Sequence, residues 1–288
     1  MELFNVISGS FGLQFTIVLV LGLLFGSFLN VVIYRLPRML FRQWQEECQI
    51  FLQETKDKPA EKINLWGPGS HCPHCKTAIK AWQNIPLLSF ILQKGRCAHC
   101  KTKISYRYPL VELLSTLILL WVLWVYGFTL VGLAFGALSL GLIALSFIDL
   151  DEEILPDNIT LPLLWLGLLC SLQGSFIPPE DAILGAAAGY SALWLVGNIY
   201  KLLRHKEGMG QGDYKLLALL GAWTGWQTLP FILLLSSVIG ALVGLSLIAL
   251  RRHTVHKPIP FGPYLCFAGF ITLIYPHWLQ SFYQWIGP

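Results

Sequence analysis

Hydrophobic residues dominate this chain in long runs that are separated by short polar or basic segments. Most of the runs approach the roughly 20 residues that an α-helix needs to cross about 30 Å of hydrocarbon. Backbone groups in hydrocarbon must satisfy their hydrogen bonds internally, so each run predicts a helix. The sequence thus predicts an all-α polytopic membrane protein with about eight transmembrane helices. Their runs are Leu13–Ile33, Leu110–Tyr126, Thr129–Ile148, Ile159–Leu172, Ala182–Leu203, Tyr214–Trp226, Leu229–Leu250 and Phe261–Phe282.

The composition supports a membrane protein. Of the 288 residues, 55% are hydrophobic and 12% are charged, and the mean hydropathy is +0.60. A soluble domain carries about 25% charged residues, so a water-soluble globule is excluded. The first run is long enough to span a bilayer and no basic segment precedes it, so it predicts a retained helix and not a cleaved signal peptide.

The positive charges predict the topology. Of the 20 Lys and Arg, 13 lie between Arg35 and Arg107, a segment with only five acidic residues. The positive-inside rule places this segment in the cytoplasm, a reading that we prefer to nucleic-acid binding. Eight crossings then return every other basic residue to the same side, with both termini outside. Without the short run Tyr214–Trp226, three of them would lie on the opposite side: Arg251, Arg252 and Lys257.

Three domains follow from this pattern: a first helix (1–34), a cytoplasmic loop domain (35–109) and a seven-helix domain (110–288). Within the loop, the charged stretch Glu46–Lys62 predicts a solvated helix or a flexible tether, which ends at Gly67-Pro68-Gly69. No internal repeat is evident.

The loop contains two Cys-x-x-Cys pairs that are separated by 21 residues, namely Cys72, Cys75, Cys97 and Cys100. Four thiolates complete the tetrahedral shell that structural zinc prefers, although the spacing slightly exceeds the usual range of about 15 to 20 residues. A pair of disulfides is the alternative, which a reducing cytoplasm disfavours. Another soft metal also stays open. Four cysteines leave no position for the neighbouring histidines His71, His74 and His99.

Acidic residues at the ends of two apolar runs are candidates for catalysis, because ionisable groups in a membrane are costly. Asp149 ends the third run, and Asp213 follows Gly208-Met-Gly-Gln-Gly at the start of the sixth. The topology places both at the cytoplasmic face. Two carboxylates in one site can share a proton, so that one activates water while the other donates to a carbonyl. This pattern predicts an aspartyl protease.

Two alternatives stay open at this point. Asp149 and Asp213 could instead end one helix and cap the next, because Asp is a common N-cap residue. The acid that partners Asp213 is also not fixed, since Asp151 and Asp157 follow in the same stretch. Asp149 adjoins two apolar residues and is the deepest of the three.

Together these motifs resemble the type IV prepilin peptidases, which are bifunctional leader peptidases and N-methyltransferases of bacterial pilus and type II secretion systems. The resemblance extends along nearly the whole chain. Besides the two Cys pairs and the two Asp motifs, it includes Gly26–Pro37, Asn84-Ile-Pro86, Ile104–Glu112 and Pro260-Phe-Gly-Pro263.

The resemblance implies an intramembrane aspartyl protease of the bacterial inner membrane, with Asp149 and Asp213 as its catalytic residues. Its substrates would be prepilins and pseudopilins, which carry a basic leader before a hydrophobic helix and are cut after a Gly. The new N-terminal residue would be methylated from S-adenosylmethionine. The Cys-containing loop is associated with methylating members, but residues 35–107 contain no recognisable S-adenosylmethionine fold, so no residue is assigned to that cofactor.

Two other classes compete with the enzyme. A transporter also uses intramembrane carboxylates, but these lie near the midplane of the membrane and not at one face. A zinc-containing membrane scaffold would explain the Cys pairs and leave the two Asp motifs without a role. Lipid is a partner of every one of these classes, and nucleic acid of none.

Overall fold

The structure is a computed structural model that describes residues 11–52, 63–174, 176–250 and 259–274. These residues form helices and no β-strand, as the sequence predicts. Five helices are long and apolar enough to cross a membrane, so the chain is a membrane protein. They are α2 (Phe11–Phe51), α4 (Arg107–Tyr126), α5 (Leu130–Glu152), α7 (Pro179–Arg204) and the span Trp226–Ala249, which contains α9 (Leu229–Ala249).

Three shorter helices coincide with the other predicted runs: α6 (Asp157–Ser171), α8 (Gln211–Thr224) and α10 (Gly262–Ile274). Each of the eight runs therefore contains a helix. Residues 275–282 of the last run lie outside the described residues, as do Arg251, Arg252 and Lys257, on which the predicted topology depends. The number of crossings stays a prediction.

The chain divides into two compact units, Met1–Leu140 and Gly141–Pro288. Helix α5 passes from one unit into the other. The first unit contains both the Cys-containing loop and the helices on either side of it, α2 and α4. The predicted division into three domains stays a prediction.

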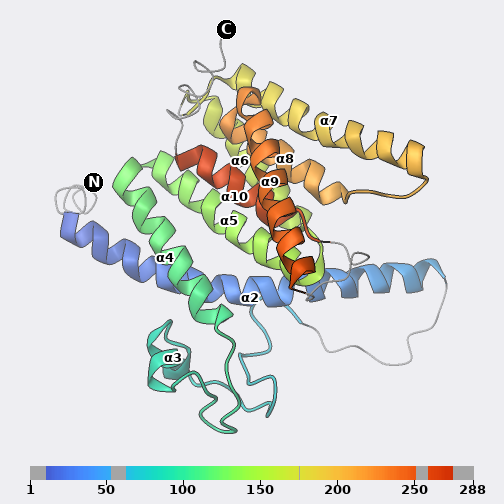
Figure 1. Ribbon diagram of the computed structural model, residues 1–288. Helices are drawn as coiled ribbons and strands as arrows, with labels where there is room; N and C mark the ends of the chain where they lie inside the picture. The colour runs from blue at the N-terminus through green and yellow to red at the C-terminus, as the bar shows by residue number, and fades with distance from the viewer. Residues whose placement is uncertain (1–10, 53–62, 175, 251–258, 275–288) are drawn as a thin grey trace. The chain divides into compact units, whose positions relative to one another are not determined.

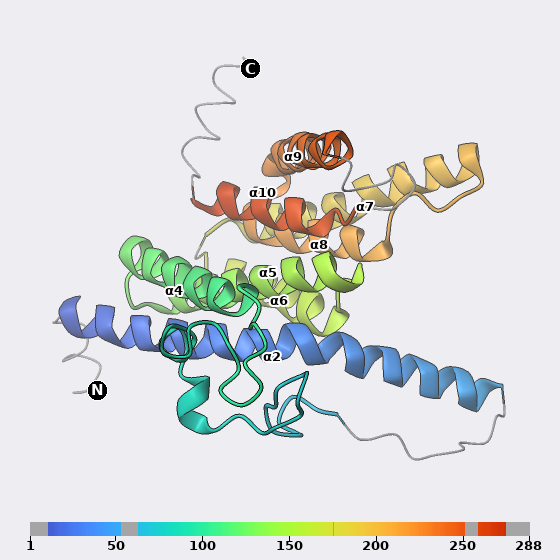
Figure 2. The same ribbon diagram turned by 60° about the horizontal axis from the view of Figure 1, so that its bottom comes forward.

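Within the first unit, α2 and α4 pack side by side (Figures 1 and 2). A Cβ atom on Gly26 would lie 2.6 Å from Cα of Glu112, and one on Gly22 would lie 2.8 Å from Cα of Thr116. Only small residues let two helices approach this closely. Asn30 adds a polar contact, because its Nδ2 donates to the carbonyl oxygen of Tyr108 at 3.1 Å. The start of α4 is thereby fixed against α2.

Helix α2 is longer than its apolar run and continues through Pro37 to Phe51. Its last turns are polar, and Gln43 Nε2 donates to Glu47 Oε1 at 2.9 Å, a stabilising contact between residues four apart. The solvated helix predicted from Glu46 is therefore confirmed as far as Phe51 and is continuous with the first span. Residues 53–62 lie outside the described residues.

Helix α8 forms the centre of the second unit, where α6, α7 and α10 pack against it (Figure 2). Its residues are buried from Leu216 to Trp223. A Cβ atom on Gly189 of α7 would lie 2.6 Å from the carbonyl oxygen of Leu217, so the two backbones are in contact. Trp223 Nε1 donates to the carbonyl oxygen of Leu163 on α6 at 2.9 Å. These contacts fix α8, whose first turn carries Asp213.

Candidate active site and metal centre

Asp149 and Asp213 lie in one buried site, where three helix ends meet. Asp149 lies near the end of α5, Asp213 lies in the first turn of α8, and Gly262 begins α10. The residues Asp149 and Asp213 are only 5% and 9% exposed. Asp149 Oδ2 accepts a hydrogen bond from the backbone N–H of Gly262 at 2.9 Å. The charge of Asp149 acts on Asp213, so the two carboxylates are electrostatic neighbours.

Leu155 packs against this site from the segment between α5 and α6. A Cβ atom on Gly212 would lie 2.8 Å from Leu155 Cβ, and one on Gly262 would lie 3.2 Å from Leu155 Cδ1. The glycine before Asp213 and the glycine that binds Asp149 thus contact the same apolar side chain. Leu155 forms an apolar wall that favours water exclusion around the carboxylates.

Neither aspartate occupies a helix-capping position in the structure. Asp213 is the third residue of α8, and the cap position is Gly210. Helix α5 continues past Asp149 to Glu152. The first turns of α8 and α10 both lie at the site, and helix N-termini stabilise negative charge through their free amides. The Gly262 N–H is one of these amides.

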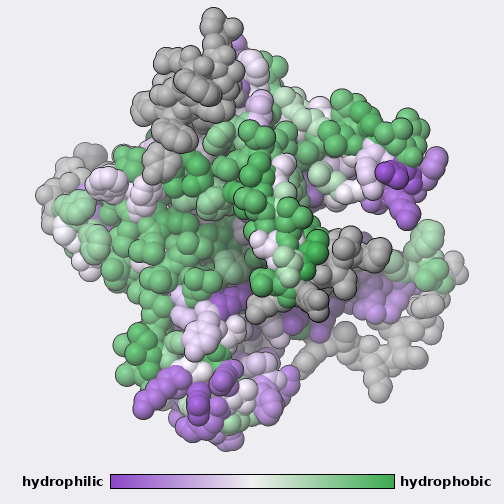
Figure 3. Space-filling view, in the orientation of Figure 1, coloured by the Kyte–Doolittle hydropathy of each residue, from purple (hydrophilic) through white to green (hydrophobic). Residues whose placement is uncertain are grey.

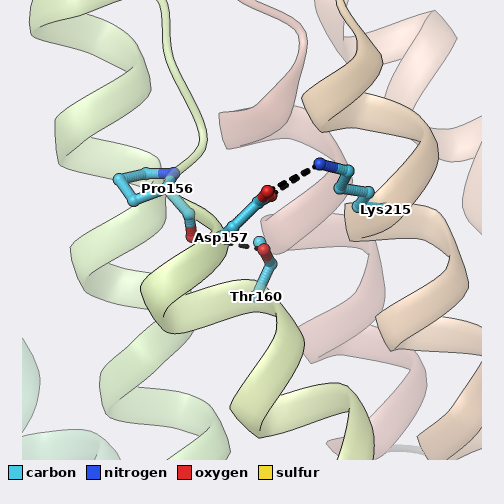
Figure 4. A network of polar contacts seen from close by, with 4 residues as sticks. All are labelled: Pro156, Asp157, Thr160 and Lys215. Atoms are coloured by element: carbon cyan, nitrogen blue, oxygen red, sulfur yellow. Dashed lines mark hydrogen bonds and ion pairs between the residues drawn. The ribbon is translucent and has the colours of Figure 1, made fainter. Parts of the chain in front are cut away.

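The two other acids of the stretch lie in different environments. Asp151 is exposed. Asp157 forms an ion pair with Lys215, in which Nζ lies 2.8 Å from both carboxylate oxygens (Figure 4). This pair joins the first turn of α6 to the first turn of α8, two residues beyond Asp213. Of these three acids, Asp149 is the one that lies buried beside Asp213.

Two residues at this site were missed in the sequence. Gly262 belongs to the quoted Pro-Phe-Gly-Pro motif, but a backbone donor leaves no signal in residue type. Lys215 is the second residue after Asp213, and this short spacing was the available signal.

The four loop cysteines come together in the first unit. Their Sγ atoms all lie within 4.8 Å of one another, and Cys72 Sγ and Cys100 Sγ are 3.8 Å apart. A tetrahedral zinc ion with Zn–S bonds of about 2.3 Å separates its sulfurs by about 3.8 Å, so the cluster fits this metal. All four are free thiols, and no His of the described residues joins the group.

The two Cys pairs share one backbone conformation. The amides of Cys72 and Cys97 donate to the carbonyl oxygens of Thr77 and Thr102 at 3.0 and 2.8 Å, and the Lys after each pair has a positive φ of 58° or 59°. This geometry reveals a short repeat, Cys-x-x-Cys-Lys-Thr-x-Ile, that was overlooked in the sequence.

The threonines of this repeat also act on the thiols. The Thr102 side chain lies 3.3 Å from Cys100 Sγ, and this contact is the main cause that lowers the pKa of Cys100 to about 6. Thr77 likewise lowers the pKa of Cys75. Thiolates are the form that binds metal, so both threonines favour ligation.

Two models of known protein families match this chain. Residues 20–126 match the Bacterial Peptidase A24 N-terminal domain, and residues 136–245 match the Type IV leader peptidase family. No solved structure matches the chain.

Several similar proteins carry the name Prepilin leader peptidase/N-methyltransferase. The one from Stutzerimonas stutzeri is 50% identical over 92% of each chain. Those from Pseudomonas aeruginosa and Neisseria gonorrhoeae are each 49% identical, over 89% of both chains in the first case, and over 88% of this chain and 87% of the relative in the second. With this identity over nearly its full length, the chain belongs to the type IV leader peptidase family.

Proposed function

We propose that this protein removes the basic leader of type IV prepilins and type II secretion pseudopilins after a Gly, and then methylates the new N-terminus. The observation that carries the proposal is the buried pair Asp149 and Asp213 in a chain of the leader peptidase family. Relatives of about 50% identity are named for both activities. A transporter or a scaffold gives no reason for this pair to lie together at helix ends.

The surroundings of the two aspartates support a different role for each. A backbone N–H that donates to a carboxylate stabilises its charged form. Asp149 accepts such a bond from Gly262, so Asp149 is the base that takes a proton from the attacking water. Asp213 holds the shared proton and donates it to the oxygen of the scissile carbonyl. When the tetrahedral intermediate collapses, Asp149 gives its proton to the leaving amine and Asp213 takes a proton from a hydroxyl of the intermediate, so the pair regains its starting state.

For the membrane topology, we infer eight crossings, with residues 35–109 and both aspartates at the cytoplasmic side of the bacterial inner membrane and both termini outside. Helices in all eight apolar runs and the basic segment 35–107 support this arrangement. The first helix (1–34), the loop domain (35–109) and the seven-helix protease domain (110–288) are the proposed domains.

For the cofactors, we propose that Cys72, Cys75, Cys97 and Cys100 hold a structural zinc ion. S-adenosylmethionine supplies the methyl group when it is bound.

The direct test uses the purified full chain in lipid nanodiscs with a prepilin that retains its leader. Intact-mass spectrometry should show a product that lacks the leader, and one additional methyl group when S-adenosylmethionine is present. If folded protein in nanodiscs does not cleave the prepilin, the scaffold or the transporter is favoured.

Replacing Gly262 with Ala should impair cleavage strongly. Its Cβ atom would lie 2.6 Å from Asp149 Oδ2, so the carboxylate must move from its amide donor. A displacement of about 1 Å in a catalytic group costs about 10²-fold in rate, and we expect a loss in kcat of that order. Gly210→Ala is the matched control, because its Cβ would meet only Asp213 Oδ2, at 3.9 Å. Equal activity of the two variants would contradict the assigned contact.

The exposed acids beside Asp149 should attract the basic leader. Glu152 and Glu153 are exposed acids next to the site, as is Asp151, whereas Asp157 is paired with Lys215. Replacing both with Gln should raise KM roughly two- to tenfold at low salt, with a smaller effect at high salt and an unchanged kcat. Glu180→Gln, an exposed acid at the start of α7, is the control. An unchanged KM at low salt would exclude this role.

A further inference from the structure

Between the two Cys pairs, the segment 81–92 exposes an unusual number of large apolar side chains. It contains a 3-10 helix, η1 (Ala81–Asn84), and the short helix α3 (Leu88–Leu92). Figure 3 shows hydrophobic side chains at α3 and hydrophilic ones along the neighbouring loop. A water-exposed patch of this kind needs a partner. We call it the apolar face, formed by Trp82 (55% exposed), Ile85 (44%), Leu88 (50%), Ile91 (69%) and Leu92 (66%).

Helix α3 has one packed side and one exposed side, and the exposed side belongs to the apolar face. Phe90 is the aromatic residue of α3, and its ring packs edge-on against Tyr106 with centroids 5.7 Å apart. Gly95 also lies against the Phe90 ring. Phe90 therefore packs against other residues of the first unit. Its neighbours Leu88, Ile91 and Leu92 stay uncovered.

A hydrogen bond fixes the depth of this segment relative to α4. The backbone N–H of Leu87 donates to Glu112 Oε2 at 2.8 Å. Glu112 lies within the apolar run of α4, about 8 Å from the start of the helix at 1.5 Å per residue. With 20 residues, α4 is about 30 Å long and needs nearly all of this length to cross the hydrocarbon. Leu87 therefore lies within about 8 Å of the point where α4 enters the hydrocarbon, and α3 lies just beyond the start of α4 (Figure 1).

The attachment at Leu87 is rigid. Leu87 has φ 57° and ψ −49°, and the N–H of Leu88 donates to the carbonyl oxygen of Pro86 at 2.6 Å. This is a classical γ-turn, a rare and strained conformation that persists only where its surroundings impose it. Glu112 is buried, and its backbone packs against Gly26 of α2, so the carboxylate extends from a fixed point of α4. The turn thus holds α3 at one depth.

Basic residues flank the apolar face. Lys80, Lys94 and Arg96 are exposed, and the sequence has no acidic residue between Glu61 and Glu112. Cationic side chains next to an apolar surface suit anionic phospholipid headgroups, and Trp is favoured where headgroups meet acyl chains. The charge and the hydrophobicity of this segment therefore both favour a membrane that contains anionic phospholipid.

We propose that the apolar face binds the bilayer, with its five side chains inserted at the boundary between headgroups and acyl chains. Lys80, Lys94 and Arg96 contact anionic headgroups, and Glu112 is the positioning residue that sets the depth through Leu87. The segment between the Cys pairs is then an interfacial element and not a soluble loop. Its insertion holds the Cys cluster against the membrane surface.

Photolabelling tests this proposal without reference to enzymatic activity. The full chain is reconstituted in nanodiscs of phosphatidylethanolamine and phosphatidylglycerol that contain a phospholipid with a diazirine near the glycerol end of one acyl chain. After irradiation and digestion, mass spectrometry should find lipid adducts on peptides from 81–92 and from α4, and none on peptides from 70–79. Adducts confined to the membrane-spanning helices would overturn the proposal.

A pair of variants tests the side chains. Ile91→Asp combined with Leu92→Asp should lower the yield of adducts on 81–92 at least fivefold, while bound metal stays unchanged. His74→Asp combined with His99→Asp adds the same charges at exposed positions outside the apolar face, and labelling should persist. If the Ile91 and Leu92 variant loses its metal, its loop has unfolded, and the proposal is then judged by the adduct pattern of the wild type. Should added prepilin abolish the lipid adducts on 81–92 while those on α4 persist, the face binds substrate and the proposal is wrong.

Discussion

Asp149→Asn and Asp213→Asn should each abolish leader cleavage, with a loss in kcat of at least about 10²- to 10⁴-fold, the range that acid–base catalysis contributes. Asn keeps the size of Asp and removes the exchangeable proton, so each variant leaves the site either without its base or without its acid. Both side chains lie in the second unit, buried next to each other where α5, α8 and α10 meet. Because the mechanism needs one carboxylate charged and the other protonated, cleavage by the wild type should follow a bell-shaped pH profile.

The measurement is single-turnover cleavage of a prepilin at matched enzyme concentration. Glu180→Gln is the control, since Glu180 lies at the start of α7, whose first turns pack near the far end of α8 from Asp213. Methylation of a pre-cleaved pilin should survive in both Asn variants, which would separate the two activities. Normal cleavage by Asp149→Asn would transfer its role to Asp151, because Asp157 is paired with Lys215.

Replacing Cys72 and Cys97 together with Ser should remove the bound metal and abolish methylation while leaving cleavage in place. Together the two replacements remove one thiolate from each Cys pair, so neither pair retains both of its ligands. Structural zinc contributes about 10 to 16 kcal/mol to the folding of small zinc-binding peptides. This free energy exceeds the stabilisation that the few buried residues of the loop supply. The loop should therefore unfold locally, and proteases should cut it at sites that are protected in the wild type.

Metal content by plasma mass spectrometry, together with cleavage and methylation assays, checks this prediction. The wild type should hold one zinc ion per chain. The matched control replaces Cys48 and Cys170, which lie outside the cluster on α2 and α6, with Ser. Full metal content in the Cys72 and Cys97 variant would show that these thiols are not the ligands. Loss of cleavage together with the metal would show that the loop supports both activities.

Much of this protein could be predicted from local sequence patterns. Apolar runs long enough to span a bilayer became helices, because a backbone in hydrocarbon has few other ways to satisfy its hydrogen bonds. The spacing of the four cysteines predicted a cluster, because two residues between thiols suit a shared metal. The two aspartates were recognisable because charges at the ends of apolar runs are costly.

Other features depended on the tertiary structure, because they join residues that are far apart in the chain. The sequence placed Asp149 deepest of the three acids, but its burial beside Asp213 and the ion pair of Asp157 with Lys215 came only from the fold. Gly262 acts through its backbone N–H on a residue 113 positions away, which no side-chain pattern announces.

The same reason applies to the loop. Glu112 reads in the sequence as one polar residue near a helix start, and only packing shows that its carboxylate holds a strained turn at Leu87. The sequence by itself determined which apolar segments form helices and which residue types are available for chemistry. The tertiary structure decided which of them meet, because the close contacts of α2 with α4 and of α7 with α8 set the positions of distant side chains.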